Sequence, residues 1–200
     1  VEFLNVGLPS ETVSGLSEAG HAGGAFPRPD GHERLERVLA RLRPDLVFAC
    51  YGMNDGGYRP YEESVGKNYE NNMRNVLTKL GKLGIKQVVV GSPGAVDSDF
   101  FRPGQQLGSQ PAHVAYNDNL AHLRDIDRQL AAAAQQRFAD VHAAMIEAMD
   151  AGRFANTELA ELRAELDTLR RESPRASPED HVTAARLTGA VGVLDADDPE

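Results

Sequence analysis

The sequence predicts an α/β fold of three layers, with helices on both faces of a parallel sheet. Segments with strand and helix patterns alternate along the first 150 residues of the 200-residue chain. Residues 46–50 are a continuously apolar run of strand length, a pattern typical of a strand covered on both faces, and residues 87–90, Q-V-V-V, indicate another buried strand. The segments between the strands carry apolar residues at helical spacing. Parallel β-α-β units packed in three layers accommodate this alternation.

The individual elements follow from the same patterns. The expected strands are at residues 1–6, 46–50, 87–90 and 138–141, and the expected helices are at residues 32–42, 61–83 and 113–135. The longest apolar stripe, in the second helix, consists of Val65, Tyr69, Met73, Val76, Leu77 and Leu80. Gly84 favours the end of this helix. Ligands of such sheets bind beyond the carboxyl ends of the strands. The candidate site therefore lies among the loops at residues 7–12, 51–57 and 91–108.

The last quarter of the chain differs from the rest, so we expect an α/β domain at residues 1–150 and a helical region at residues 151–200. Four leucines there have heptad-like spacing: Leu159, Leu162, Leu166 and Leu169. This spacing fits either a helix that lies on the domain surface or a short oligomerisation seam. A linker with two prolines is expected at residues 173–180, and a final helix at residues 182–194.

Composition excludes several functional classes. The chain has 30 acidic and 21 basic residues, a net charge of −9, which argues against nucleic acid as a partner. No apolar run approaches the roughly 18 residues of a membrane helix. Cys50 is the one cysteine, so an internal disulfide and a multi-cysteine zinc site are excluded. No histidine pair with metal-ligand spacing and no glycine-rich phosphate motif occurs, so no metal and no cofactor are expected. Compartment and oligomeric state stay open.

Two loops carry residue types that could perform chemistry, and each directly follows an expected strand. The first reads N-V-G-L-P-S-E-T at residues 5–12, and the second reads Y-G-M-N-D at residues 51–55. At the carboxyl end of a strand, the side-chain amide of Asn54 can point into a crevice. There it can stabilise a developing oxyanion together with backbone N–H groups. Asn, Asp and Gly are also common turn residues on any surface, so local chemistry leaves both interpretations open.

Together, the two loops resemble the second and third conserved blocks of the SGNH (GDSL-type) hydrolases. The third block of that family is G-x-N-D, and residues 52–55 match it fully. In the second block Asn5 and Thr12 match, whereas Ser10 and Glu11 stand where the family commonly has Gly and Asp. The pair of blocks is a specific signal, although either block alone is a weak one.

The resemblance extends from residue 1 to about residue 149 and implies a flavodoxin-like parallel sheet. It also implies a Ser-His-Asp triad that hydrolyses an acyl or carbohydrate ester, a small-molecule substrate. Carried over residue by residue, the oxyanion hole would use the backbone N–H of Ser10 and the side chain of Asn54. The residues that would border the substrate cleft are Gly7, Gly52 and Asp55.

The chain departs from the family pattern at the catalytic residues. The family nucleophile belongs to a G-D-S block on the first, central strand, and no G-D-S occurs in the 200 residues. We therefore expect that this strand and the nucleophilic serine are missing, which would leave two strand edges unpaired. The family's last block is D-x-x-H, for which His181 is the candidate base. Pro178 occupies the acid position, and the adjacent Asp180 is the candidate acid.

Other candidate catalytic residues are expected to be structural. Ser92 follows a strand, but Pro93 favours a turn over a nucleophile. His142 comes two residues after Asp140, an arrangement that resembles an acid and a base but fits a structural histidine after the last strand. Two function classes therefore remain: an SGNH-type ester hydrolase, and a non-catalytic binding or interaction domain that keeps the fold and the cleft.

Overall fold

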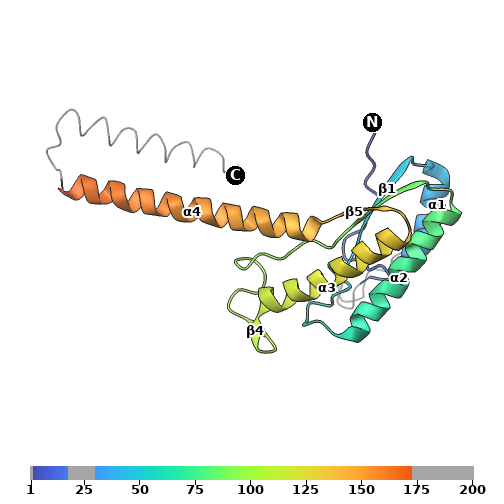
Figure 1. The fold of residues 1–200 in the computed structure, drawn as a ribbon, viewed down its shortest axis with the longest axis horizontal. Helices are drawn as coiled ribbons and strands as arrows, with labels where there is room; N and C mark the ends of the chain where they lie inside the picture. Colours follow the sequence, from blue (N-terminus) through green and yellow to red (C-terminus); the bar gives the residue numbers. More distant parts are fainter. Residues whose placement is uncertain (1, 18–29, 173–200) are drawn as a thin grey trace. The chain divides into compact units, whose positions relative to one another are not determined.

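The computed structural model describes residues 2–17 and 30–172 of the chain (Figure 1). The chain divides into two compact units, Val1–Ile146 and Glu147–Glu200. The parallel sheet and the loops of the candidate site belong to the first unit. The expected linker and final helix, with His181 and Asp180, lie outside the described residues.

Three parallel strands form the main sheet of the first unit. In spatial order they are β1 (Leu46–Cys50), β2 (Gln87–Gly91) and β5 (Arg137–Ala139). Val90 of the central strand lies opposite Ala49 on one side and opposite Phe138 on the other. Its side chain is fully buried. The parallel pairing that the alternation of elements predicts is confirmed.

Helices flank this sheet, in agreement with the expected three-layer α/β/α architecture. They are α1 (Gly31–Leu42), α2 (Glu63–Lys82) and α3 (Ala112–Ala133). The carboxylate of Asp30 starts α1 by accepting the N–H of Glu33 at 3.0 Å. Gly84, with a φ of +78°, follows the end of α2 as expected. The predicted stripe of α2 packs into the core, where α2 contacts α3 and α3 contacts β2 and β5.

One face of β1 is exposed, so the expectation that this strand is covered on both faces is wrong for it. Ala49 is buried in the core, whereas Leu46 and Cys50 are exposed and the side chain of Phe48 is 52% exposed. The cause is position: β1 lies at the edge of the three-stranded sheet. Among the described residues no strand pairs with its outer edge.

The strand expected at residues 1–6 is not formed by residues 2–6, which have no strand pairing. Apolar residues alone do not make a strand, because each strand needs a hydrogen-bonded neighbour. This segment is instead held by side chains. The guanidinium of Arg34 donates to the carbonyl of Val6, and the carbonyl oxygen of the Asn5 side chain accepts the N–H of Gly7 at 3.0 Å. Phe3 remains 89% exposed.

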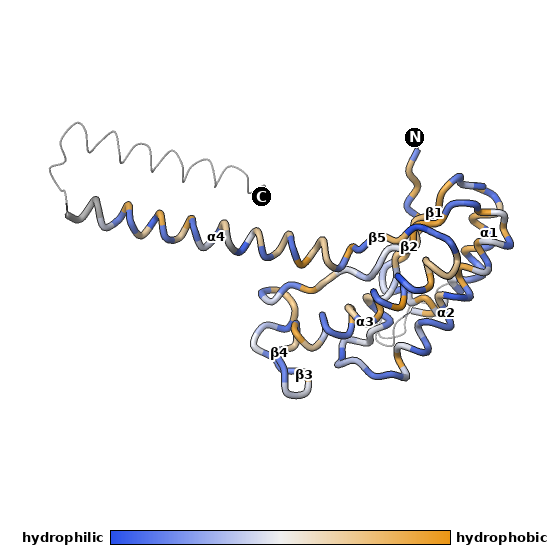
Figure 2. The backbone as a smooth tube through the Cα atoms, viewed as in Figure 1, coloured by the Kyte–Doolittle hydropathy of each residue, from blue (hydrophilic) through white to orange (hydrophobic). Residues whose placement is uncertain are grey.

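The last expected strand is shorter than predicted, because Asp140 starts a helix. Its side chain accepts the N–H of Ala143 at 3.0 Å, and α4 (Val141–Glu172) begins at the next residue. Figure 2 shows hydrophobic and hydrophilic residues alternating along α4. Leu159 and Leu166 are buried, and the choice between a surface helix and an oligomerisation seam stays a prediction. No helix within the described ranges is long and apolar enough to cross a membrane.

The long loop between β2 and α3 contains a small antiparallel pair of strands. These are β3 (Gln106–Leu107) and β4 (Gln110–Pro111). The amide of Asn117 on α3 brackets the start of this loop, donating to the carbonyl of Val96 and accepting its N–H at 2.9 and 2.8 Å. The loop is therefore anchored on the helix that also supports the candidate site.

Candidate active site

The loop that follows β1 folds tightly against β2. Gly52 has a φ of +111°, a conformation that side chains rarely adopt. A Cβ at this position would lie 2.9 Å from the Cβ of Pro93, so the glycine also permits close approach of the next strand's loop. Gly56 donates its N–H to the carbonyl of Gly52 at 3.0 Å and closes the loop. This local geometry determines where Asn54 is presented.

The side chain of Asp55 connects the loop after β1 to the end of the second-block loop. Its carboxylate accepts the N–H of Val13 at 2.9 Å and the N–H of Gly52 at 3.1 Å. Burial raises the pKa of Asp55 to about 6, against the lowering effect of these backbone hydrogen bonds. Asp55 was expected at the substrate cleft, but it is not among the residues that line the cavity described below. The structure gives it a scaffolding position.

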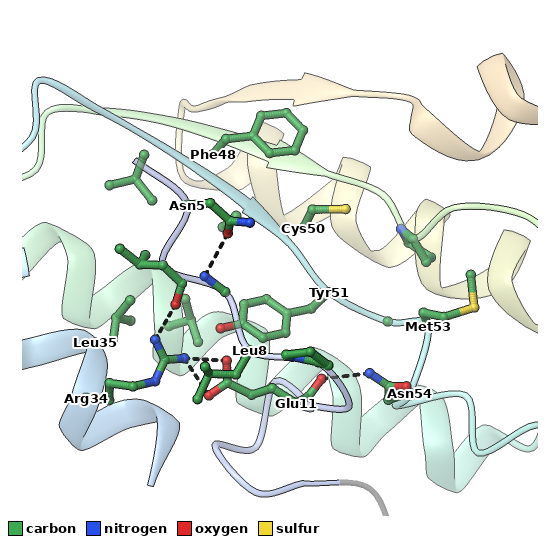
Figure 3. A pocket seen from close by; sticks show the side chains of 18 of the residues that line it. Asn5, Leu8, Glu11, Arg34, Leu35, Phe48, Cys50, Tyr51, Met53 and Asn54 are labelled. Atoms are coloured by element: carbon green, nitrogen blue, oxygen red, sulfur yellow. Dashed lines mark hydrogen bonds and ion pairs between the residues drawn. The ribbon is translucent and has the colours of Figure 1, made fainter. Parts of the chain in front are cut away.

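Asn54 contacts the second-block loop through its side chain (Figure 3). Its Nδ2 donates to the carbonyl of Glu11 at 3.1 Å, and its Oδ1 accepts the hydroxyl of Tyr58 at 2.6 Å. An amide nitrogen carries two N–H groups. Among the described residues Glu11 takes one of them, so the other is available to a ligand.

Ser10 lies directly before Glu11 and adopts a left-handed backbone conformation, with a φ of +61°. This conformation favours glycine, which explains why the resembling family commonly has Gly at this position. The N–H of Ser10 donates to no other group in the part of the chain that the structure describes. The structure therefore brings the two predicted oxyanion donors, on Ser10 and Asn54, to adjoining segments of backbone.

Glu11 ties the second-block loop to α1. Its two carboxylate oxygens accept from Nη2 of Arg34 at 2.7 and 2.5 Å. The two side chains are only 7% and 11% exposed, respectively. The hydroxyl of Tyr51 shares this environment. Burial, followed by the charge of Glu11, raises the pKa of Tyr51 to about 12. The ion pair and the phenol thus hold residues 4–11 against the end of β1.

Replacing Glu11 by glutamine is expected to lower the free energy of unfolding by about 1–2 kcal/mol, because Arg34 then keeps a largely buried charge without a counter-ion. Urea denaturation measures this loss. The control is Glu33→Gln, which removes an exposed pair with Arg37 on α1. That change is expected to cost less than about 0.5 kcal/mol. Equal losses in the two variants would contradict a role for the Glu11 pair in holding the loop.

A cavity of about 440 Å³ lies between the second-block loop and the outer edge of β1. Its lining includes the predicted site residues Gly7, Ser10, Gly52 and Asn54. Apolar side chains from α1, α2 and β1 form much of the wall: Leu35, Leu39, Val47, Val76 and Leu80. Figure 3 shows the polar side chains of Glu11, Arg34 and Asn54 beside this apolar wall. Ser10 and Asn54 therefore line a cavity whose wall is largely apolar.

Ser92 and His142 form a structural contact. The Ser92 side chain is fully buried; its hydroxyl accepts the backbone N–H of His142 at 2.9 Å and contacts the carbonyl of Pro93 at 3.1 Å. The Nδ1 of His142 lies 3.0 Å from the carbonyl of Gly94. The hydrogen bond between His142 and the Ser92 hydroxyl therefore comes from the backbone of His142 and not from its imidazole, as the structural interpretation predicts. Within the described ranges, no three His, Cys, Asp or Glu side chains gather as metal ligands.

Three polar side chains that hold the loop after β1 are missed by sequence reasoning. Tyr116 of α3 donates its hydroxyl to the carbonyl of Met53, and Asn119 donates to the carbonyls of Gly56 and Arg59 at 2.9 and 2.8 Å. Tyr58 is the third. The sequence signal for the first two is that polar residues lie within the apolar face of α3, next to Leu120 and Leu123. Both side chains are fully buried.

Comparisons with known proteins give one family match and two similar solved structures. The model of the GDSL-like Lipase/Acylhydrolase family matches residues 3–155. Among solved structures, the chain is similar to the lipase/acylhydrolase from Enterococcus faecalis, with 22% identity, a TM-score of 0.41 and coverage of 58% of this chain and 52% of that chain. It is also similar to a gut microbial diltiazem-metabolizing enzyme, with 17% identity, a TM-score of 0.47 and coverage of 92% of this chain and 37% of that chain.

The chain thus spans about half the length of the first of these structures and about a third of the second. Comparison with curated protein sequences gives no match. The family model, however, covers most of the 200 residues and includes both predicted loops. The chain belongs to the GDSL-like lipase/acylhydrolase family.

Proposed function

We propose that this chain forms the oxyanion-binding part of an acyl-ester or carbohydrate-ester hydrolase. In this proposal the side-chain amide of Asn54 and the backbone N–H of Ser10 bind the carbonyl oxygen of the ester. The observation that carries the proposal is the hydrogen bond from Asn54 Nδ2 to the carbonyl of Glu11, at 3.1 Å. It holds the amide of the third block against the loop of the second.

The chemistry follows from these two donors. When a nucleophile attacks the ester carbonyl, the carbonyl oxygen gains negative charge in the tetrahedral intermediate. Donors that are already fixed stabilise this charge without reorganising, which is typically worth 10²–10³ in rate for one donor. The second N–H of Asn54 and the N–H of Ser10 are the available groups. Gly52 and the ion pair of Glu11 keep the two segments in place.

The nucleophile and the base are assigned by resemblance. The family's G-D-S serine has no counterpart in the 200 residues, and His181 and Asp180 stay candidates for the base and the acid. Ser92 is a poor nucleophile, because its hydroxyl is buried and engaged with backbone groups. The second candidate function is a non-catalytic binding or interaction domain that keeps the fold and the cleft.

Hydrolysis of p-nitrophenyl acetate tests the proposal, using the full chain and its Asn54→Ala variant. We expect the variant to lose at least about tenfold in kcat/KM, because one oxyanion donor is removed. Asn72→Ala is the matched control, since the amide of Asn72 bonds to Asn68 on its own helix. A folded chain that hydrolyses no ester would favour the second candidate. Equal activity of Asn54→Ala and the full chain would remove Asn54 from the oxyanion hole.

A further inference from the structure

We propose that Tyr58 is a positioning residue that fixes the orientation of the Asn54 amide for oxyanion binding. The Tyr58 hydroxyl donates to Asn54 Oδ1 at 2.6 Å, a short and specific contact between two side chains of one loop. The inference deepens the proposed function and rests on it. In this proposal Tyr58 acts through Asn54 and does not contact the substrate.

The orientation of an amide decides what it does to an anion. The nitrogen end donates hydrogen bonds and stabilises negative charge, whereas the oxygen end accepts them and repels it. Glu11 supplies one constraint on the amide, because its carbonyl accepts from Nδ2 at 3.1 Å. One hydrogen bond still lets the amide plane rotate about it. The bond from Tyr58 to the opposite end of the amide removes this freedom.

Tyr58 is itself held in an unusual conformation. Its φ is +54°, and it follows Gly57 with a φ of +66°. A non-glycine residue in this region is strained and persists only when its surroundings hold it. The ring lies 5.3 Å from the ring of Tyr116 and 6.3 Å from that of Phe101, measured between centroids. The guanidinium of Arg102 donates to the Tyr58 carbonyl at 3.2 Å and lies 5.9 Å from the ring.

The backbone of the loop has supports that do not involve the Tyr58 hydroxyl. Tyr116 binds the carbonyl of Met53, and Asn119 binds those of Gly56 and Arg59. Asp55 binds the N–H of Gly52. Loss of the Tyr58 hydroxyl should therefore leave the loop backbone in place and release only the amide of Asn54. This separation distinguishes a positioning role from a merely structural one.

The first test is nuclear magnetic resonance of the full 200-residue chain, with the side-chain amide of Asn54 assigned by its loss in Asn54→Ala. In the unmodified chain this amide should exchange with solvent more slowly than the amide of Asn72. In Tyr58→Phe we expect the Asn54 side-chain signals to shift and to exchange about fivefold to tenfold faster, with unchanged backbone signals at Gly56.

Tyr61→Phe is the matched control, because it removes a hydroxyl from the same segment while its ring keeps its stack on His122, 4.0 Å away. An unchanged Asn54 amide in Tyr58→Phe, or an equal change in Tyr61→Phe, would overturn the proposal. So would exchange of Asn54 as fast as that of Asn72 in the unmodified chain, a result that needs no variant.

Ester hydrolysis supplies the second readout. Tyr58→Phe should lower kcat with little change in KM, because an amide that is free to rotate weakens the transition state more than substrate binding. If Asn54→Ala leaves hydrolysis unchanged, the proposed function fails, and so does the positioning role in catalysis. If Asn54→Ala lowers kcat while Tyr58→Phe leaves both kcat and the Asn54 amide unchanged, only the positioning role fails.

Discussion

Replacing Gly52 by alanine is expected to lower the free energy of unfolding by about 2–5 kcal/mol. Two causes add. The φ of +111° at Gly52 lies where residues with a Cβ are strained. The new Cβ would also lie 2.9 Å from Pro93 Cβ and 3.0 Å from Pro93 Cγ, so the strand end or the Pro93 loop must move. Because Gly52 precedes Asn54 by two residues, any esterase activity should fall as well.

Gly57→Ala separates the two causes. Gly57 lies in the same loop with a φ of +66°, but the nearest atom to its Cβ would be Arg59 Nε at 3.5 Å, an ordinary contact. This variant should lose only the conformational part, about 1 kcal/mol. Urea denaturation of both variants measures the difference. If the two substitutions destabilise the chain equally, the close packing of Gly52 against Pro93 does not contribute to the loss of unfolding free energy.

The helices α1 to α3 and the inner strand β2 could be predicted because their signals are local. The stripe that includes Met73 and Leu80 repeats at helical spacing, and a helix buries whatever lies on that stripe. Val88 and Val90 are buried in the central strand β2, which pairs with β1 on one side and with β5 on the other. For such segments the sequence pattern and the tertiary surroundings agree, so the pattern alone suffices.

In residues 2–6 and in β1 the sequence pattern and the structure differ. The segment containing Phe3 and Leu4 has an apolar pattern that is typical of a strand, yet it forms no strand pairing. The exposure of Phe48 likewise follows from the position of β1 at the edge of the sheet. Strand formation depends on a neighbour that can be distant in sequence, and a single segment carries no information about that neighbour.

The candidate site divides in the same way. Asn54 and Ser10 were found through two short motifs, and the structure brings these motifs together. Tyr58 could not be found, because its contact with Asn54 depends on two successive residues of positive φ and on aromatic neighbours from other parts of the chain. Asp55 was assigned to the cleft by its motif, whereas its buried hydrogen bonds give it a scaffolding position.

A buried acid in the core also governs how stability depends on pH. Tyr69 of α2 donates its hydroxyl to both carboxylate oxygens of Asp127 on α3, at 3.0 and 2.9 Å. Both side chains are inaccessible to solvent. Burial raises the pKa of Asp127 from its ordinary 3.8 to about 8; Tyr69 opposes this shift and the nearby charge of Asp55 adds to it. Partial burial, followed by the charge of Asp127, also raises the pKa of Cys50 on β1.

The sign of the effect follows from the two pKa values. In the unfolded chain Asp127 loses its proton near its ordinary pKa of 3.8, whereas the folded chain keeps the proton up to about pH 8. Between these values the folded state binds more protons, so stability falls as the pH rises. Below pH 3.8 the stabilisation that comes from this proton is complete, and it is lost as the pH rises to about 8. Asp55, with a pKa of about 6, adds a smaller fall that ends earlier.

Asp127→Asn should remove the part of this fall that Asp127 causes, up to about pH 8. The asparagine stays neutral and still accepts the Tyr69 hydroxyl, so from about pH 5 to about pH 9 the variant should gain roughly 4 kcal/mol in unfolding free energy relative to the unmodified chain. Urea denaturation across this pH range measures the gain. Asp118→Asn, at an exposed position on the same helix, should follow the unmodified chain. Parallel pH profiles for all three proteins would mean that Asp127 is charged in the folded core, and that Tyr69 and the surrounding dipoles solvate it as well as water does.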